Sequence, residues 1–371
     1  HATIRRQRQM CIRDRSAPGV VGVFTGSDIA ADKVGGPICG WVVPCRDGSS
    51  TKEPPHPLLA QGKVRFVGDA VAVVVAETME QAKSAAELID VDYNELTPVV
   101  DFVNADEGAQ IHEEVPNNCY FDWELGDESA TNKAIESAAK VVKLSVRNNR
   151  LVPNAMEPRS ALAEYDSLDE SYTLHTTSQN PHLTRLVLAA FMFAIPESKL
   201  RVIAPDVGGG FGSKIYVYIE EAVCVWASKK IGRPVKWTAD RTQAFLTDCH
   251  GRDHVNDVQL ALDENNKIIG LRVDTVCNLG AYLSAFSVVV PTILHGTLLS
   301  GQYDIPAIYT NVKGMATNTV NVDAYRGAGR PEATYLLERT METAAKEVGM
   351  DPAEFRSCLL YTSPSPRDIG E

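Results

Sequence analysis

A run of glycines at residues 208–212 constrains this chain more than any other feature. The surrounding segment, 206–214, reads DVGGGFGSK, and a helical pattern follows it. Because glycine has no side chain, the backbone can approach a neighbour closely and offer its N–H groups to an anion. The P-loop signature fails because Lys214 follows Ser213, and the dinucleotide signature G-x-G-x-x-G fails in its last spacing. The loop therefore needs another explanation.

Charge and composition exclude several classes of protein. The chain has 371 residues, a hydrophobic content of 44% and a formal net charge of −12. This length allows two domains with sizeable cores. The acidic charge argues against a nucleic-acid partner or an anionic membrane surface. No apolar run is long enough to span a bilayer, so we expect no membrane insertion.

The metal-ligating residue types are scattered. The eight cysteines form no C-x-x-C pair, and the eight histidines give no cluster that argues for a zinc or iron site. We therefore expect no iron–sulfur cluster or structural zinc within this chain. Reduced, buried thiols are typical of a cytoplasmic protein, which is the compartment that we predict.

Residues 16–100 are predicted to form a small α/β domain. The stretch 64–75, VRFVGDAVAVVV, is rich in β-branched residues and predicts a strand with a break in its middle. Thr78 and Gln81 have the spacing of a helix capping box. Alanines at helical spacing follow, and 90–93 predicts another strand, which together indicate a β-α-β unit.

A polar, weakly patterned linker is expected at 101–123, followed by a larger α+β domain at 124–356. Alternating apolar residues predict strands at 139–147, 172–179, 255–262 and 268–276. One helix is predicted to follow the glycine run and to end at Gly232, and another to begin at Pro331 and end before Gly349.

The two ends of the chain differ from the rest. The stretch 6–15, RQRQMCIRDR, is strongly basic within an acidic protein, and 357–371, SCLLYTSPSPRDIGE, interrupts a helix that has just begun. Both strings resemble translated sequencing-adapter read-through. We therefore predict that 1–15 is a partly artefactual leader, that 357–371 is an artefactual tail, and that the natural protein continues beyond Arg356.

Three turn-like stretches carry the residues best suited to chemistry: TTSQNPH at 176–182, DVGGGFGSK at 206–214 and AYRGAGR at 324–330. With MEPR at 156–159 and RPVKW at 233–237, and in this order, they resemble the large subunit of molybdenum hydroxylases. That family includes xanthine dehydrogenase, aldehyde oxidoreductase and aerobic carbon monoxide dehydrogenase. The resemblance is strongest to the form II, carbon-monoxide-dehydrogenase-like branch, and covers nearly all of the chain between its two foreign ends.

This resemblance implies a fold, a cofactor and partners. It implies a hammerhead-type α/β domain followed by a molybdopterin-binding α+β domain, of which this chain holds the first part. Molybdenum would be held only through the dithiolene of a pterin, in bacterial members often the cytosine dinucleotide form. The reaction would hydroxylate an aldehyde or N-heterocycle with oxygen from water. Electrons would pass to a small [2Fe–2S] subunit and a medium FAD subunit in a dimer of heterotrimers.

The resemblance also assigns roles to single residues. Gln179 matches the family glutamine that hydrogen-bonds an oxo group on molybdenum, and its amide can donate while staying neutral. Gly209, Gly210, Phe211 and Gly212 match the loop that lies against the pterin, where glycines permit close backbone approach. Phe211 is expected to help exclude water. The alternatives are a glutamine that stabilises a turn and a purely structural glycine loop.

Arg326 matches the arginine of the active-site loop, where a guanidinium can stabilise charge on an anionic cofactor. The alternative is a solvent-facing loop arginine. Gly327 and Ala328 would also contact the cofactor, and both depart from relatives. Carbon monoxide oxidisers carry a copper-binding cysteine at Gly327, and glycine has no ligand atom. Ala328 is small where xanthine-type members carry an aromatic residue, so the pocket should differ.

Glu157 could serve as a general base, but we favour a structural salt bridge with Arg159 or a neighbour. In the family, the base is a glutamate far toward the C-terminus. The sequence does not include that region, so we expect this chain to lack the glutamate base and to be inactive as it stands.

Other classes of function remain open. One is a phosphate- or nucleotide-binding enzyme built on the glycine loop, and another is a genuine carbon monoxide dehydrogenase. A third is an assembly protein that keeps the fold without catalysis.

Overall fold

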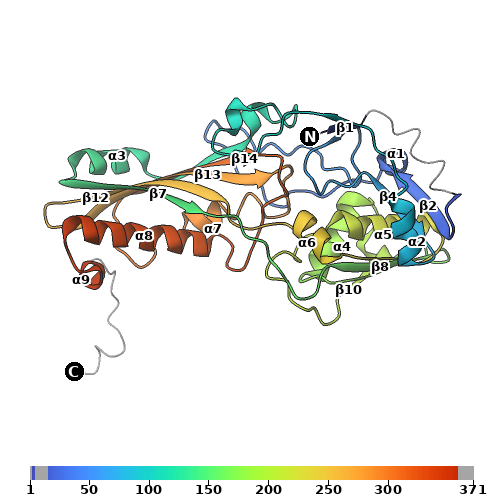
Figure 1. Cartoon of the computed structure of the whole chain (residues 1–371). Helices are drawn as coiled ribbons and strands as arrows, with labels where there is room; N and C mark the ends of the chain where they lie inside the picture. Colours follow the sequence, from blue (N-terminus) through green and yellow to red (C-terminus); the bar gives the residue numbers. More distant parts are fainter. Residues whose placement is uncertain (1, 5–15, 358–371) are drawn as a thin grey trace, which may run out of the picture.

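The computed structural model describes residues 2–4 and 16–357 (Figure 1). The basic stretch 6–15 and nearly all of the predicted tail 357–371 lie outside the described residues. The described residues form four sheets, with two, three, four and five strands. In the part of the chain that is described, no helix combines the length and apolar character needed to cross a membrane.

The first part of the chain contains two small sheets. Strands β2 and β4 pair antiparallel, and β1 lies between β3 and β5. The elements are β1 (Ala2–Ile4), β2 (Val20–Thr25), α1 (Gly26–Ala31), β3 (Lys63–Val64), β4 (Ala72–Ala76), α2 (Met79–Ala86) and β5 (Tyr93–Glu95). The capping box of Thr78 and Gln81 is confirmed at the start of α2.

The predicted β-α-β unit is wrong in one respect, because β4 and β5 lie in different sheets. The partner of β5 is β1, at the start of the chain, and local sequence patterns cannot reveal such a distant pairing. The break in 64–75 is real. A turn separates β3 from β4, and the Asp69 carboxylate accepts a hydrogen bond from the Arg65 amide across it at 2.9 Å.

A four-stranded sheet with the order β10-β9-β8-β11 forms the next layer. Its elements are β8 (Ser160–Asp166), β9 (Ser171–Thr176), α4 (Pro181–Leu186), β10 (Leu200–Ile203), α5 (Ile219–Ile231), β11 (Val235–Thr238) and α6 (Arg241–Thr247). Helix α5 packs across β8. Gly232 ends α5 in the left-handed conformation, as predicted.

The first part of the chain packs against α5. Leu58 and Leu59 join Trp226 in one buried core, and the Trp226 indole N–H donates to the Asp32 carboxylate at 2.9 Å. Arg233, just beyond α5, makes a two-pronged ion pair with Glu77 at 2.7 and 2.8 Å. These contacts dock the first two sheets onto the four-stranded one.

A five-stranded sheet, β6-β14-β13-β12-β7, forms the far end of the molecule. Figure 1 shows α3 on one face of this sheet and the long helix α8 on the other. The elements are β6 (Cys119–Gly126), α3 (Glu128–Ser137), β7 (Lys140–Asn148), β12 (His254–Leu262), β13 (Ile268–Gly280), α7 (Ile293–Gly296), β14 (Ile308–Ala316), α8 (Arg330–Val348) and α9 (Pro352–Ser357). Helix α8 begins at Arg330, one residue before the predicted Pro331, and Gly349 ends it as predicted.

The linker expected at 101–123 is not an open connection. Residues 119–123 already belong to β6, which pairs with β14. Ile111, Val115 and Tyr120 are buried in a core beneath the five-stranded sheet. Two short 3₁₀ helices, Ala105–Glu107 and Pro116–Asn118, lie in this segment. The buried residues around them are spaced irregularly and follow neither the helical nor the strand period, which is why the sequence shows only a weak pattern here.

Candidate cofactor site

Two of the three predicted loops start from neighbouring strands. Strands β9 and β10 are parallel and adjacent, so their carboxyl ends meet at the same edge of the sheet. Gln179 follows β9 and the glycine loop follows β10. Because ligands commonly bind beyond the carboxyl ends of parallel strands, this edge is a natural place for a site.

Gln179 is bound to the glycine loop. Its side-chain oxygen accepts hydrogen bonds from the backbone amides of Gly212 at 2.9 Å and Lys214 at 3.3 Å. The backbone N–H of Gln179 donates to the Lys214 carbonyl at 2.7 Å. A Cβ on Gly210 would lie 2.2 Å from that same side-chain oxygen. Gly210 is therefore required for Gln179 to occupy this position.

The loop at 324–330 contacts the glycine loop from the other side. The Arg326 amide donates to the Phe211 carbonyl at 2.8 Å, and the Arg326 guanidinium carbon lies 5.9 Å from the centre of the Phe211 ring. A Cβ on Gly212 would lie 2.3 Å from the Ala324 carbonyl oxygen, and Gly212 has a φ of +105°. The structure therefore brings Gln179, Phe211 and Arg326 together, although they are distant in the sequence.

The side chains of Gln179, Phe211 and Arg326 are exposed. Phe211, which we expected to help exclude water, is 41% exposed within the described residues. Its backbone has a φ of +54°, which is uncommon for a bulky residue and costs energy. The loop thus holds an aromatic side chain at the surface in a strained conformation, a feature that is enriched at functional sites.

Several hydrogen-bond donors on these contacting loops have no partner among the residues described here. They are the Gln179 side-chain nitrogen and the backbone amides of Gly210 and Phe211. Arg326 makes no ion pair with any described carboxylate. Donors without acceptors are suited to a group rich in oxygen or sulfur acceptors that carries negative charge.

Glu157 and Lys214 fasten the base of the glycine loop. The Lys214 ammonium is buried and donates to the Glu157 carbonyl at 2.8 Å and to its carboxylate at 3.0 Å. The Gly208 amide donates to the same carboxylate at 2.7 Å. Burial raises the Glu157 pKa, but the Gly208 amide and Lys214 outweigh it and leave the pKa lowered. This carboxylate is held ionised, as in the structural salt bridge that we favoured.

Arg159 is not the partner of Glu157. Its guanidinium is buried and pairs with Glu220 at 2.8 Å and Asp248 at 2.6 Å. It also stacks 3.6 Å from the centre of the Tyr218 ring. The Tyr218 hydroxyl in turn donates to the Ser213 carbonyl at 2.6 Å, so Arg159 supports the glycine loop indirectly.

The glycine loop does not lie at a helix N-terminus. Helix α5 begins at Ile219, with Tyr218 as its N-cap, several residues after the last glycine. The helix that we expected directly behind the loop is therefore displaced. A phosphate held by the glycine loop would not receive the first-turn amides of α5, which weakens the phosphate-binding alternative.

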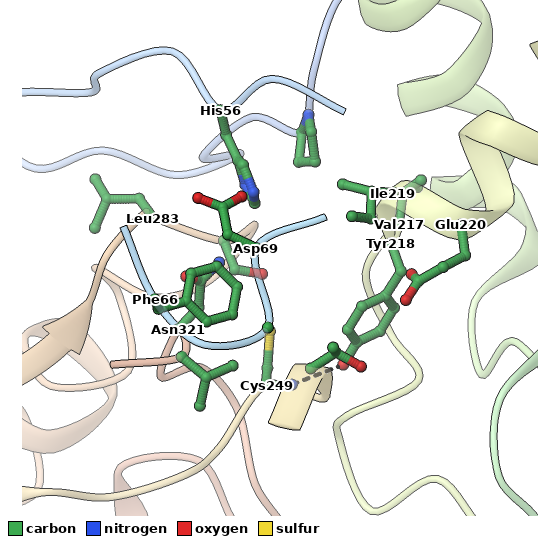
Figure 2. A pocket seen from close by; sticks show the side chains of 15 residues that line it. His56, Phe66, Asp69, Val217, Tyr218, Ile219, Glu220, Cys249, Leu283 and Asn321 are labelled. Atoms are coloured by element: carbon green, nitrogen blue, oxygen red, sulfur yellow. Dashed lines mark hydrogen bonds between the residues drawn. The ribbon is translucent and has the colours of Figure 1, made fainter. Parts of the chain in front are cut away.

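A separate small cavity lies between the first part of the chain and the second. It has a volume of about 40 Å³, and Figure 2 shows His56 and Asp69 directed into it from one side and Cys249 from the other. The His56 ring stacks on Tyr282 with 3.9 Å between ring centres. Burial raises the pKa of Asp69 to about 6. The lining does not include Gln179, Phe211 or Arg326, so this cavity is distinct from the loop site.

The fold and this site together define a class of protein. Residues 111–358 match the molybdopterin cofactor-binding domain, and residues 1–97 match the a/b hammerhead domain of aldehyde oxidase and xanthine dehydrogenase. The two matches cover most of the chain in the predicted order. The chain belongs to the molybdopterin-binding family of aldehyde oxidase and xanthine dehydrogenase, as a large subunit that resembles those of the carbon monoxide dehydrogenases.

Individual relatives support this assignment. The chain is 34% identical to the carbon monoxide dehydrogenase large chain of Hydrogenophaga pseudoflava, covering 92% of this chain and 43% of the relative. It is 31% identical to the nicotine 6-hydroxylase large subunit of Paenarthrobacter nicotinovorans, covering 91% and 41%. The crystal structure of quinoline 2-oxidoreductase from Pseudomonas putida 86 superposes with a TM-score of 0.88 at 32% identity, covering 100% of this chain and 46% of that one. The chain thus spans less than half the length of these relatives.

Sequence reasoning missed the residues that hold the third loop in place. The Arg252 guanidinium donates to the Tyr325 carbonyl at 3.2 Å and to the Arg326 carbonyl at 3.0 Å, and it pairs with Glu332 at 2.8 Å. The Tyr216 hydroxyl donates to the Ala324 carbonyl at 3.0 Å. Arg252 and Glu332 are charged residues that are buried in the structure, and a single sequence does not reveal that burial.

Proposed function

We propose that this chain forms the cofactor-binding part of the catalytic large subunit of a molybdenum hydroxylase that oxidises an aldehyde or an N-heterocycle. When bound, the cofactor would replace a substrate C–H bond by C–OH with oxygen from water, releasing two electrons and two protons. Gln179 and Arg326 are the expected catalytic residues of this chain. Names of relatives that act on nicotine and quinoline support an N-heterocyclic substrate.

The observation that carries this proposal is the convergence of unpaired donors. The Gln179 side-chain nitrogen, the amides of Gly210 and Phe211, and the Arg326 guanidinium lie on loops that contact one another. Their chemistry fits a dithiolene-linked metal with oxygen ligands and an anionic tail, because these groups accept hydrogen bonds and carry negative charge. Gly209 and Gly212, both with positive φ, let the glycine loop pack closely against the Phe211 ring and the Ala324 carbonyl, which helps to hold these donors in place.

Gly327 supports an organic substrate over carbon monoxide. Its φ is +103°, and a Cβ there would lie 2.4 Å from Pro331 Cγ. A cysteine at this position would be strained and would collide with the first turn of α8. The loop geometry thus disfavours a copper ligand here, in addition to the absence of a ligand atom in glycine. Gly327 and Ala328 instead leave a small-residue surface beside Arg326.

The electrons of this reaction require an exit. Within the described ranges, no group of three or more histidine, cysteine, aspartate or glutamate side chains is placed to hold a metal ion. We therefore place the electron acceptors in partner chains, a small [2Fe–2S] subunit and a medium FAD subunit, assembled as a dimer of heterotrimers. Relatives described as large chains and as a complex subunit support this arrangement. We further propose the cytosine dinucleotide form of the cofactor and a cytoplasmic location.

Cofactor analysis tests the proposal. The protein would be expressed in a bacterium that makes the molybdenum cofactor, purified, and analysed for metal and for oxidised, fluorescent pterin. The proposal predicts about one molybdenum and one pterin per chain, with cytidine monophosphate released on hydrolysis. A chain that carries neither molybdenum nor pterin, alone or with copurifying subunits, would contradict it. A bound nucleotide without molybdenum would support the phosphate-binding alternative instead.

A further inference from the structure

Arg252 lies behind the loop that presents Arg326. Its side chain is 9% exposed, and it reaches the loop from the segment that precedes β12. One guanidinium nitrogen donates to the Tyr325 carbonyl and the other to the Arg326 carbonyl. The same guanidinium pairs with Glu332 in the first turn of α8.

Two contacts therefore fix the backbone of Arg326. Its amide donates to Phe211 in the glycine loop, and its carbonyl accepts from Arg252. Because both the N–H and the carbonyl of Arg326 are held by hydrogen bonds, the direction in which its side chain extends from the backbone is fixed. We propose that Arg252 and Glu332 act together as positioning residues, which set the place of the Arg326 guanidinium at the cofactor site; this inference rests on the proposed function.

Backbone strain on both sides of this contact supports the assignment. Arg252 and the next residue, Asp253, have φ values of +69° and +71°, and Ala328 has a φ of +43°. Each is unfavourable for a residue with a side chain and persists only where the surroundings enforce it. Asp253 is held by Arg150 at 2.8 Å and by Asn278 at 3.0 Å. The molecule thus keeps a costly conformation that delivers Arg252 to the loop.

The burial of Glu332 supports it as well. The Glu332 side chain is fully buried, and one of its carboxylate oxygens has no hydrogen-bond partner among the described residues. A buried ion pair is often no more stable than apolar side chains of similar volume. Stability alone therefore does not explain this pair, whereas the alignment of the loop carbonyls does, because a planar guanidinium can hold two carbonyls and a carboxylate at once.

The test compares Arg252→Lys with Arg272→Lys. Lysine keeps the charge at 252 but offers a point charge in place of the planar fork, so it cannot hold both carbonyls and Glu332 together. Arg272, on β13, also uses its guanidinium for several contacts, in its case ion pairs with Asp274 and Glu128, and it contacts none of the three loops, so it serves as the control. Both variants would be purified from a cofactor-making host together with any copurifying subunits.

Three measurements follow for each variant: the melting temperature, molybdenum per chain, and hydrogen exchange of amides in 324–330. Arg252→Lys is expected to exchange its Arg326 amide about tenfold faster or more, and to carry less molybdenum per chain than the wild type, because the carbonyls of Tyr325 and Arg326 are no longer held together. Arg272→Lys is expected to change neither. Glu332→Gln should reproduce the effect of Arg252→Lys in weaker form.

The outcomes separate the two proposals. Wild-type protein without molybdenum would contradict the proposed function. Wild-type protein that holds molybdenum, together with Arg252→Lys and Arg272→Lys that match it in loop exchange and in molybdenum per chain, would overturn the positioning role. A fall in melting temperature without faster loop exchange would also overturn it, because that pattern indicates a purely structural residue.

Discussion

Gly210→Ala is the substitution whose consequence follows most directly from the structure. The new methyl carbon would lie 2.2 Å from the Gln179 side-chain oxygen and 2.5 Å from its Cγ, so the glutamine must move. Moving it breaks the hydrogen bonds from the amides of Gly212 and Lys214. At about 0.5–1.5 kcal/mol each, the loss is about 1–3 kcal/mol. Because every 1.4 kcal/mol is a factor of ten, cofactor affinity should fall roughly 5- to 150-fold if the bound state needs this arrangement.

A double-mutant cycle isolates the cause. In a Gln179→Ala background the side-chain atoms that obstruct the new methyl group are absent, so Gly210→Ala should cost less than about 0.5 kcal/mol. Unfolding free energies and molybdenum per chain would be measured for the four proteins. An equal cost of Gly210→Ala in both backgrounds would refute the contact between Gln179 and the loop.

Three further outcomes are expected. Glu157→Gln should destabilise the protein by about 2–3 kcal/mol, because it leaves the buried Lys214 ammonium poorly compensated. Lys214→Met should destabilise it less, because methionine removes that charge, and denaturant unfolding of both variants checks this order. Asp69 has its pKa raised to about 6, above its unfolded value, so its contribution to stability is present below about pH 4 and lost as pH rises through 6. Between pH 4 and 7 the free energy of unfolding of Asp69→Asn should therefore fall less than that of the wild type, with a difference of at most about 3 kcal/mol. Wild-type and variant curves of unfolding free energy against pH that run parallel would contradict this prediction. Gly327→Cys should bind no stoichiometric copper and should lower stability by about 1–3 kcal/mol, because its Cβ meets Pro331; metal analysis and a thermal melt are the measurements.

Much of the fold was predictable from the sequence because its signals are local. Residues that begin or end helices indicated the positions of α2, α5 and α8. Thr78 caps the start of α2, and Gly232 and Gly349 end α5 and α8 in the left-handed conformation. Alternation located β7 and the β12–β13 hairpin. The pairing of β5 with β1 and the burial of 111–121 were not predictable, since both depend on partners far along the chain.

The residues of the candidate site could be predicted from the sequence, but the residues that hold its loops in place could not. Gln179, Phe211 and Arg326 came from resemblance to a family, and the structure brings them to one surface. Their supports did not come from any motif. Lys214, Arg252 and similar residues are charged side chains that become buried only in the folded chain, and a single sequence gives no sign of that burial.

The central claim is that three loops from distant parts of the chain hold one molybdenum cofactor. A crystal structure of the protein purified from a cofactor-making host, with anomalous diffraction recorded on both sides of the molybdenum absorption edge, tests it most directly. We predict a single molybdenum peak with pterin density bounded by Gln179, Phe211 and Arg326. A molybdenum peak elsewhere on the molecule, with these three side chains contacting only solvent, would contradict the account.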